Sequence, residues 1–155
     1  MLYITYILFV TLMVAADQFS KYLVVKMIPL YDEIKIIDGF FSLTYVRNYG
    51  AGFSVLQNET ILFKVITIVA LIVLAYLLYK SKSNEIAYRI AYLLLISGAI
   101  GNFIDRCRYA YVVDFLDFIF FGWDFPIFNV ADCFITVGCF ILIVLAFMES
   151  KNAKC

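Results

Sequence analysis

The sequence predicts an all-α integral membrane protein with four transmembrane helices and a small β-element in the first long loop. Of the 155 residues, 65% are hydrophobic and 15% are charged, whereas soluble domains average about 45–50% apolar and about 25% charged residues. Four apolar stretches are each long enough to cross a hydrocarbon core of about 30 Å. These observations exclude a soluble globular protein, and we expect a single membrane-embedded domain over residues 1–155.

The predicted spans cover residues 2–27, 61–79, 86–104 and 130–148. The first span is expected to be retained rather than cleaved as a signal peptide. No Lys or Arg precedes it, and its apolar run continues past Lys21. A short connection at residues 80–85 joins the second and third spans, whereas the other two connections are long.

Two β-prone runs, residues 33–37 and 41–46, lie in the first long connection. Asp38-Gly39 stands between them, and an Asp-Gly pair between such runs favours a hairpin. The sequence therefore predicts a small sheet at the membrane surface. The second long connection, residues 106–129, is aromatic and acidic and is expected to be a loop.

The positions of Lys and Arg predict the orientation of the spans. Lys80 and Lys82 occupy the short connection, and Lys151 and Lys154 follow the last span. Basic residues concentrate in short cytoplasmic loops. We therefore expect both termini in the cytoplasm, and both long connections, with the β-element, on the extracytoplasmic side.

Residue usage excludes several classes of function. Lys plus Arg and Asp plus Glu number 12 each, so the net charge is zero and a nucleic-acid partner is not expected. The chain contains no histidine, which excludes imidazole-based catalytic triads and histidine-ligated metals. The cysteines lack metal-binding spacing, so we expect packing residues and no metal site. They are Cys107, Cys133, Cys139 and Cys155.

Polar residues inside the first predicted span point to a specific role, because such groups are costly in hydrocarbon. Asp17, Ser20 and Lys21 fall at i, i+3 and i+4, on one face of a helix. Two interpretations remain open for Asp17 and Lys21. They form an internal ion pair that fixes packing and depth, or Asp17 takes part directly in catalysis.

A second polar group lies at the end of the third predicted span. Ser97 and Gly101 allow another helix to approach closely. Asn102, Asp105 and Arg106 form a polar stripe beside them. Helix packing explains the small residues well but explains the amide, carboxylate and guanidinium poorly, so the pattern favours a functional site.

Two further carboxylates precede or begin the fourth predicted span. Asp132 follows Asn129, a predicted N-cap, and a helix N-terminus alone can account for it. Asp114 interrupts an apolar run and has no such explanation. Two aspartates that share a proton have pKa values pushed apart, so one can activate water while the other donates a proton. The pair therefore favours amide hydrolysis without a covalent intermediate.

A series of motifs follows one order along the chain: DQFSK, VRNYGAGF, GAIGNFIDR, VVDFLD and FPIFNVAD, at residues 17–21, 46–53, 98–106, 112–117 and 125–132. In this order, and together with the chain length and span count, they resemble lipoprotein signal peptidase, the bacterial type II signal peptidase. Tyr49, Gly52 and Ser97 depart from the residues usual in that family.

The resemblance implies an aspartic endopeptidase with Asp114 and Asp132 as its catalytic pair. It implies supporting or substrate-binding roles for Asp17, Lys21, Asn48, Gly50, Asn102, Asp105, Arg106 and Asn129. The implied substrate is a prolipoprotein whose cysteine carries diacylglycerol, cut on the amino side of that cysteine. The resemblance implies no cofactor. We expect a monomer, in contact with membrane lipid, in the bacterial cytoplasmic membrane, with its site near the extracytoplasmic face.

Two other classes of function fit the residues less well than a peptidase. A proton- or cation-coupled transporter also uses intramembrane carboxylates, but it would place its key acid near the bilayer midplane. Asp114 lies in a connection and Asp132 at a helix start. A structural scaffold of four spans gives no reason for either carboxylate. The sequence therefore favours the peptidase.

Overall fold

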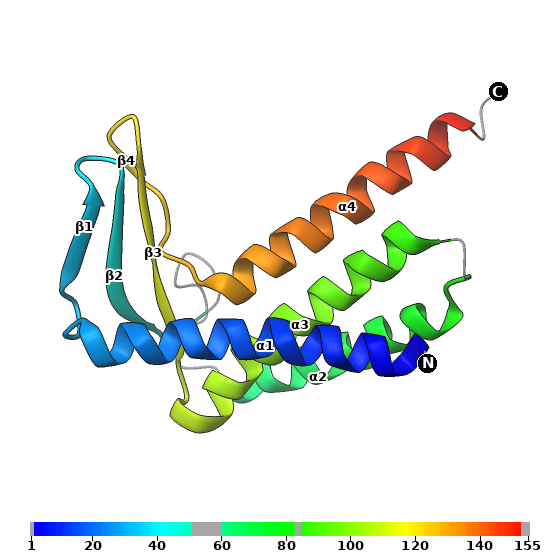
Figure 1. The fold of residues 1–155 in the computed structure, drawn as a ribbon, viewed down its shortest axis with the longest axis horizontal. Coiled ribbons are helices and arrows are strands. Elements are labelled where there is room, and N and C mark those ends of the chain that lie inside the picture. The colour runs from blue at the N-terminus through cyan, green and yellow to red at the C-terminus, as the bar shows by residue number, and fades with distance from the viewer. Residues whose placement is uncertain (1, 51–59, 83–84, 153–155) are drawn as a thin grey trace.

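The computed structural model describes residues 2–50, 60–82 and 85–152 (Figure 1). Its elements are α1 (Leu2–Met27), β1 (Glu33–Ile37), β2 (Phe41–Asn48), α2 (Thr60–Lys80), α3 (Ile86–Tyr109), β3 (Val112–Phe120), β4 (Trp123–Asp124) and α4 (Val130–Asn152). In this part of the chain, four helices are long and apolar enough to cross a membrane. The predicted membrane class is confirmed, although α3 and α4 extend past the predicted ends.

Helix α3 is the central helix of the bundle, because it packs against α1, α2 and α4. In the apolar stretch of α3 that could cross a membrane, 39% of the residues are buried, whereas no residue of the corresponding stretch of α2 is buried. An exposed helix that is apolar all round is typical of a lipid-facing span. The N-terminus and the end of α4 lie at one end of the molecule, and the sheet lies at the other (Figure 1).

Glycines bring α3 and α4 into close contact. A Cβ atom added at Gly98 would lie 2.7 Å from Cγ1 of Ile135, and one added at Gly138 would lie 2.8 Å from Cγ of Leu95. Neither position therefore has room for a side chain. Ser97 is also buried, and its hydroxyl donates to the carbonyl of Leu93 in the same helix. This agrees with the close helix approach predicted from the small residues of the third span.

The sheet is antiparallel with the strand order β1-β2-β3-β4. The predicted hairpin between β1 and β2 is confirmed, and Gly39 at its turn has a φ of 69°, which a glycine adopts without strain. The prediction that residues 106–129 form a loop is wrong. They contain β3, which pairs with β2 over a long sequence distance, for example Val46 with Asp114. The β-element therefore draws on both long connections.

The strand β3 separates an apolar core from the polar site. Val113 and Phe115 are buried in a cluster with Val24 and Ile28, which joins the sheet to α1. Successive side chains of a strand point to opposite faces. Asp114, between the two, therefore points to the other face of the sheet. This alternation explains why a carboxylate occurs inside an apolar run.

The predicted packing role of the cysteines holds only in part. Cys107 and Cys139 are exposed and Cys133 is half-buried, and none of the three forms a disulfide. Cys139 lies in α4, whose outer surface is apolar, so exposure there corresponds to contact with lipid. Cys155 lies outside the described residues.

Candidate active site

Asp114 is buried on β3 and both of its carboxylate oxygens accept hydrogen bonds. The side-chain amide of Asn129 donates to Oδ1 at 2.6 Å, and that of Asn48 donates to Oδ2 at 2.9 Å. Burial and the nearby negative charge of Asp132 raise the pKa of Asp114 to about 7. Asp114 can therefore hold a proton near neutral pH, where an ordinary aspartate is ionised.

Asp132 lies in the first turn of α4 and takes part in a reciprocal cap with Asn129. The Asn129 side-chain oxygen accepts from the Asp132 amide at 3.0 Å, and the Asp132 Oδ2 accepts from the Asn129 amide at 3.1 Å. This geometry confirms the predicted N-cap. The other oxygen, Oδ1, accepts from the side-chain amide of Asn102 at 2.8 Å. The cap therefore holds the Asp132 carboxylate in an orientation that faces α3.

Asn129 and Asn102 link the two carboxylates. Nδ2 of Asn129 donates to Asp114 and also lies 3.1 Å from Oδ1 of Asn102, and Asn102 in turn donates to Asp132. Side-chain amides orient carboxylates without titrating themselves. Asp114 from β3 and Asp132 from α4 therefore share one neutral framework.

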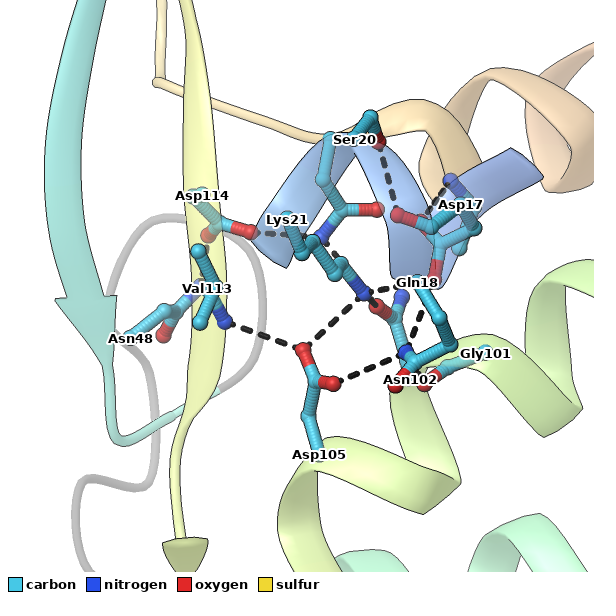
Figure 2. Close-up of polar contacts among 12 residues, drawn as sticks. Asp17, Gln18, Ser20, Lys21, Asn48, Gly101, Asn102, Asp105, Val113 and Asp114 are labelled. Atoms are coloured by element: carbon cyan, nitrogen blue, oxygen red, sulfur yellow. Dashed lines mark hydrogen bonds and ion pairs between the residues drawn. The ribbon is translucent and has the colours of Figure 1, made fainter. Parts of the chain in front are cut away.

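Lys21 is buried at the centre of a second cluster beside this framework (Figure 2). Its Nζ lies 2.9 Å from Asp17 Oδ2, 3.0 Å from Asp105 Oδ2 and 3.0 Å from Asn102 Oδ1. An ammonium has three N–H donors, so these three acceptors satisfy it. Lys21 therefore connects α1 to α3 and, through Asn102, to the aspartate pair.

Asp17 anchors the beginning of α4 to α1. Its Oδ1 accepts from the backbone amide of Ala131 at 2.9 Å, and first-turn amides of a helix otherwise lack a partner. A Cβ at Gly101 would lie only 2.6 Å from Asp17 Oδ2, so glycine is needed where α1 meets α3. Asp17 is fully buried with both oxygens occupied. These contacts favour the internal ion pair over direct catalysis.

Gln18 also belongs to this cluster, although it is not among the site residues predicted from the sequence. Its Nε2 lies 2.9 Å from Asp105 Oδ1 and 3.2 Å from the Gly101 carbonyl (Figure 2). Asp105 also accepts from the Val113 amide at 3.1 Å, which ties the end of α3 to β3. A signal was available, because Gln18 precedes Lys21 by three positions and therefore shares its helical face.

Asn48, Gly50 and Arg106 form the edge of the site. The Asn48 side-chain oxygen accepts from the Gly50 amide at 2.9 Å, and Arg106 donates to the Gly50 carbonyl at 3.3 Å. The Arg106 guanidinium also lies 5.1 Å from the ring centre of Phe63 on α2. Residues 51–53 of this motif, including Gly52, lie outside the described residues.

The structure therefore brings all the predicted site residues into one connected network. Other acidic residues of the same region lie apart from it. Asp117 accepts from the Thr44 hydroxyl at 2.6 Å on the sheet, and Asp124 is exposed on β4. In the described ranges, no group of three or more Cys, Asp or Glu residues is arranged to hold a metal ion.

Comparison with known proteins gives a consistent relationship over the chain. The family model described as signal peptidase (SPase) II matches residues 9–148. The chain is 44% identical over 153 residues to the lipoprotein signal peptidase of Enterococcus faecalis, which covers 99% of this chain and 94% of that protein. It is 48% identical over 136 residues to the lipoprotein signal peptidase of Caldanaerobacter subterraneus subsp. tengcongensis, which covers 88% of this chain and 91% of that protein.

Two solved structures described as bacterial membrane enzymes share the fold. One superposes with a TM-score of 0.90 at 38% identity and covers 96% of this chain and 90% of its own. The other has a TM-score of 0.83 at 39% identity and covers 92% of each chain. The family match and these identities agree with the polar network. The chain therefore belongs to the signal peptidase II family.

Proposed function

We propose that Asp114 and Asp132 are the catalytic pair with which this signal peptidase II removes signal peptides from prolipoproteins. The observation that carries the proposal is that both carboxylates bind the same residue, Asn129, although one comes from a strand and the other from a helix. A transporter or a scaffold, the other classes considered, would not need this convergence at the sheet end of the spans.

In the proposed reaction the pair holds one proton. Asp114 is the acid, because its raised pKa of about 7 keeps a proton available. Asp132 is partly exposed, so it can reach a water molecule and act as the base. Asp132 removes a proton from the water as its oxygen attacks the scissile carbonyl carbon, and Asp114 protonates the carbonyl oxygen. Collapse of the tetrahedral intermediate breaks the C–N bond. Asp132 gives its proton to the departing amine, and one hydroxyl of the intermediate returns a proton to Asp114 as the carbonyl re-forms.

The surrounding network supports the pair by position. Asn48 and Asn129 direct the two oxygens of Asp114, and Asn102 directs Asp132. Lys21 holds α1, α3 and the start of α4 together through carboxylates that are not part of the pair. We assign residues 1–155 to a single membrane-embedded peptidase domain that acts as a monomer.

We further propose that the sheet end of the molecule is extracytoplasmic and that both termini are cytoplasmic. Lys80 ends α2 and Lys82 follows it in the connection to α3. Both lie at the opposite end from the sheet (Figure 1) and support this orientation. The site would then meet a substrate at the outer surface of the bacterial cytoplasmic membrane, where water is available.

Labelling from one side of the membrane tests this orientation. Single cysteines at Lys82 and Asp124, in a background that lacks the native cysteines, should react with an impermeant thiol reagent from opposite sides. In intact spheroplasts, the cysteine at 124 should be labelled and the one at 82 should require lysis. Labelling of both before lysis would contradict the arrangement of four spans.

We propose that the substrate is recognised largely through its membrane-embedded parts, a signal helix and the diacylglyceryl group on its cysteine, with cleavage on the amino side of that cysteine. The exposed apolar surface of α2 supports lateral arrival from the bilayer. Each acyl CH₂ that is buried contributes about 0.8 kcal/mol.

The test of this function is cleavage by the purified protein in detergent or lipid. A lipidated precursor should give a shortened product, and the same precursor without lipid should be cleaved weakly or not at all. Mass measurement of the released peptide locates the cut. A matched precursor with serine in place of the cysteine controls for contaminating proteases. Equal rates on lipidated and unlipidated precursor would refute the proposed recognition.

A further inference from the structure

A pocket lies on the face of β3 opposite Asp114. Val113 lines it, together with the last third of α1, the end of α3 and the strand β2. Because alternate strand residues face opposite sides, Asp114 does not point into this pocket, although Gln18, Lys21 and Asp105 of the Lys21 cluster also line it. Its polar lining includes Arg47 from β2 and Arg108 from α3. Nothing in the proposed reaction uses either residue.

The two guanidinium groups of this pocket are stacked on tyrosines. Arg47 lies 4.8 Å from the ring centre of Tyr111, and Arg108 lies 5.1 Å from that of Tyr109. The two rings stack on each other at 5.5 Å with an angle of 21° between their planes. A cation stacked on a ring uses its face, whereas its N–H donors lie in its plane. The ring contacts therefore position both cations beside the pocket.

The positive charge of these arginines is not neutralised within the described part of the chain. Neither guanidinium forms an ion pair there, and Arg47 donates through Nε to the hydroxyl of Tyr45 at 3.3 Å. Asp105 also lines the pocket, but its oxygens already accept from Gln18, Lys21 and the Val113 amide. The pocket therefore presents two cations to an anion.

The outer rim of the pocket is the lipid-facing surface of α1. Tyr22 and Val25 line the pocket and are 58% and 48% exposed. The ammonium of Lys26 lies 5.9 Å from the ring centre of Tyr22, which adds a third cation to this rim. Tyrosines and basic residues at the end of a span are typical of the level of lipid headgroups. Because the rim of the pocket faces lipid, an anion bound there is expected to carry an apolar part as well.

We propose that this pocket binds the phosphate of an anionic phospholipid, with Arg47 and Arg108 holding the headgroup and the acyl chains lying along α1. A guanidinium pair matches phosphate oxygens in charge and geometry. The site belongs to the leaflet on the sheet side, whichever face of the membrane that is.

Lipid retention tests the site without reference to peptidase activity. Delipidated protein in detergent is incubated with phosphatidylglycerol or phosphatidylcholine of the same acyl chains, and bound lipid is counted by native mass spectrometry. Phosphatidylglycerol should bind more tightly. The double variant Arg47→Gln/Arg108→Gln should weaken that binding about 30-fold, as expected for the loss of two basic residues at a lipid surface. The control Lys80→Gln/Lys82→Gln, which removes equal charge at the other end, should bind like the wild type.

The remaining arms identify the ligand. Sodium phosphate and diacylglycerol should each compete poorly, because one lacks the acyl chains and the other lacks the phosphate. Strong competition by sodium phosphate alone would mean a site for a free anion and would overturn the lipid assignment. Equal binding of the two phospholipids, or full binding by a folded Arg47→Gln/Arg108→Gln variant, would overturn it as well. If that variant does not fold, the double variant Arg47→Lys/Arg108→Lys is used in its place, because it keeps both positive charges. A preference of this variant for phosphatidylglycerol that added salt weakens would support the site.

Discussion

Replacing Asp114 or Asp132 with Asn is expected to lower the rate of signal-peptide removal by about 10²–10⁴-fold. Asn has nearly the shape of Asp but cannot carry or accept the proton that the proposed reaction moves. Residues that act as a unit are not additive, so the double variant should be little slower than either single one. The measurement is the cleavage rate of a lipidated precursor per amount of folded protein.

Matched controls and stability separate a chemical role from a structural one. Asp117→Asn and Asp124→Asn, from the same region but outside the network, should retain most activity. Asp114→Asn should also remain folded. Because the pKa of Asp114 is raised in the folded protein, the protonated carboxyl gives its full stabilisation of the fold at pH values below its ordinary pKa of 3.8. That stabilisation is lost as the pH rises through about 7. The variant removes that pH-dependent loss. Substantial turnover by either single variant would contradict the mechanism.

Replacing Lys21 with Met is expected to lower the free energy of unfolding by about 3–5 kcal/mol. The change leaves the buried carboxylates of Asp17 and Asp105 without their shared cation. Removing one partner of a buried pair is costly because the remaining charge has neither solvent nor a counter-ion. Thermal unfolding in detergent measures the effect, and the exposed Lys80→Met provides the control.

A compensating variant tests the electrostatic cause. Changing Asp17 and Asp105 to Asn in the Lys21→Met background removes the unpaired charges, so much of the lost stability should return. The Asn side chain at 17 can still accept from the Ala131 amide, which preserves the start of α4. If the triple variant is no more stable than Lys21→Met alone, the lost contacts rather than the unpaired charges cause the instability.

The sequence by itself determined the spans, the β1–β2 hairpin and the cap of α4. Each depends on a local property: continuous hydrophobicity over a membrane thickness, an Asp-Gly turn between β-prone runs, and an Asn that precedes a helix. It also supplied the members of the polar network, because ionisable residues are conspicuous in apolar surroundings. Their assignment to one site came from the order of the motifs, and the proposed catalytic roles await the variants above.

Only the tertiary structure decided which groups meet. The strand β3 forms because β2 supplies its hydrogen-bonding partner from a distant part of the chain. The local sequence pattern does not contain that partner and therefore predicted a loop. Gln18 shares the helical face of Lys21, but a neutral amide is less conspicuous than a charge, and only the folded structure places Asp105 and Gly101 against it. Asp17 was ambiguous for the same reason. Its role as an anchor depends on the Ala131 amide, and α4 reaches that position only when the bundle packs.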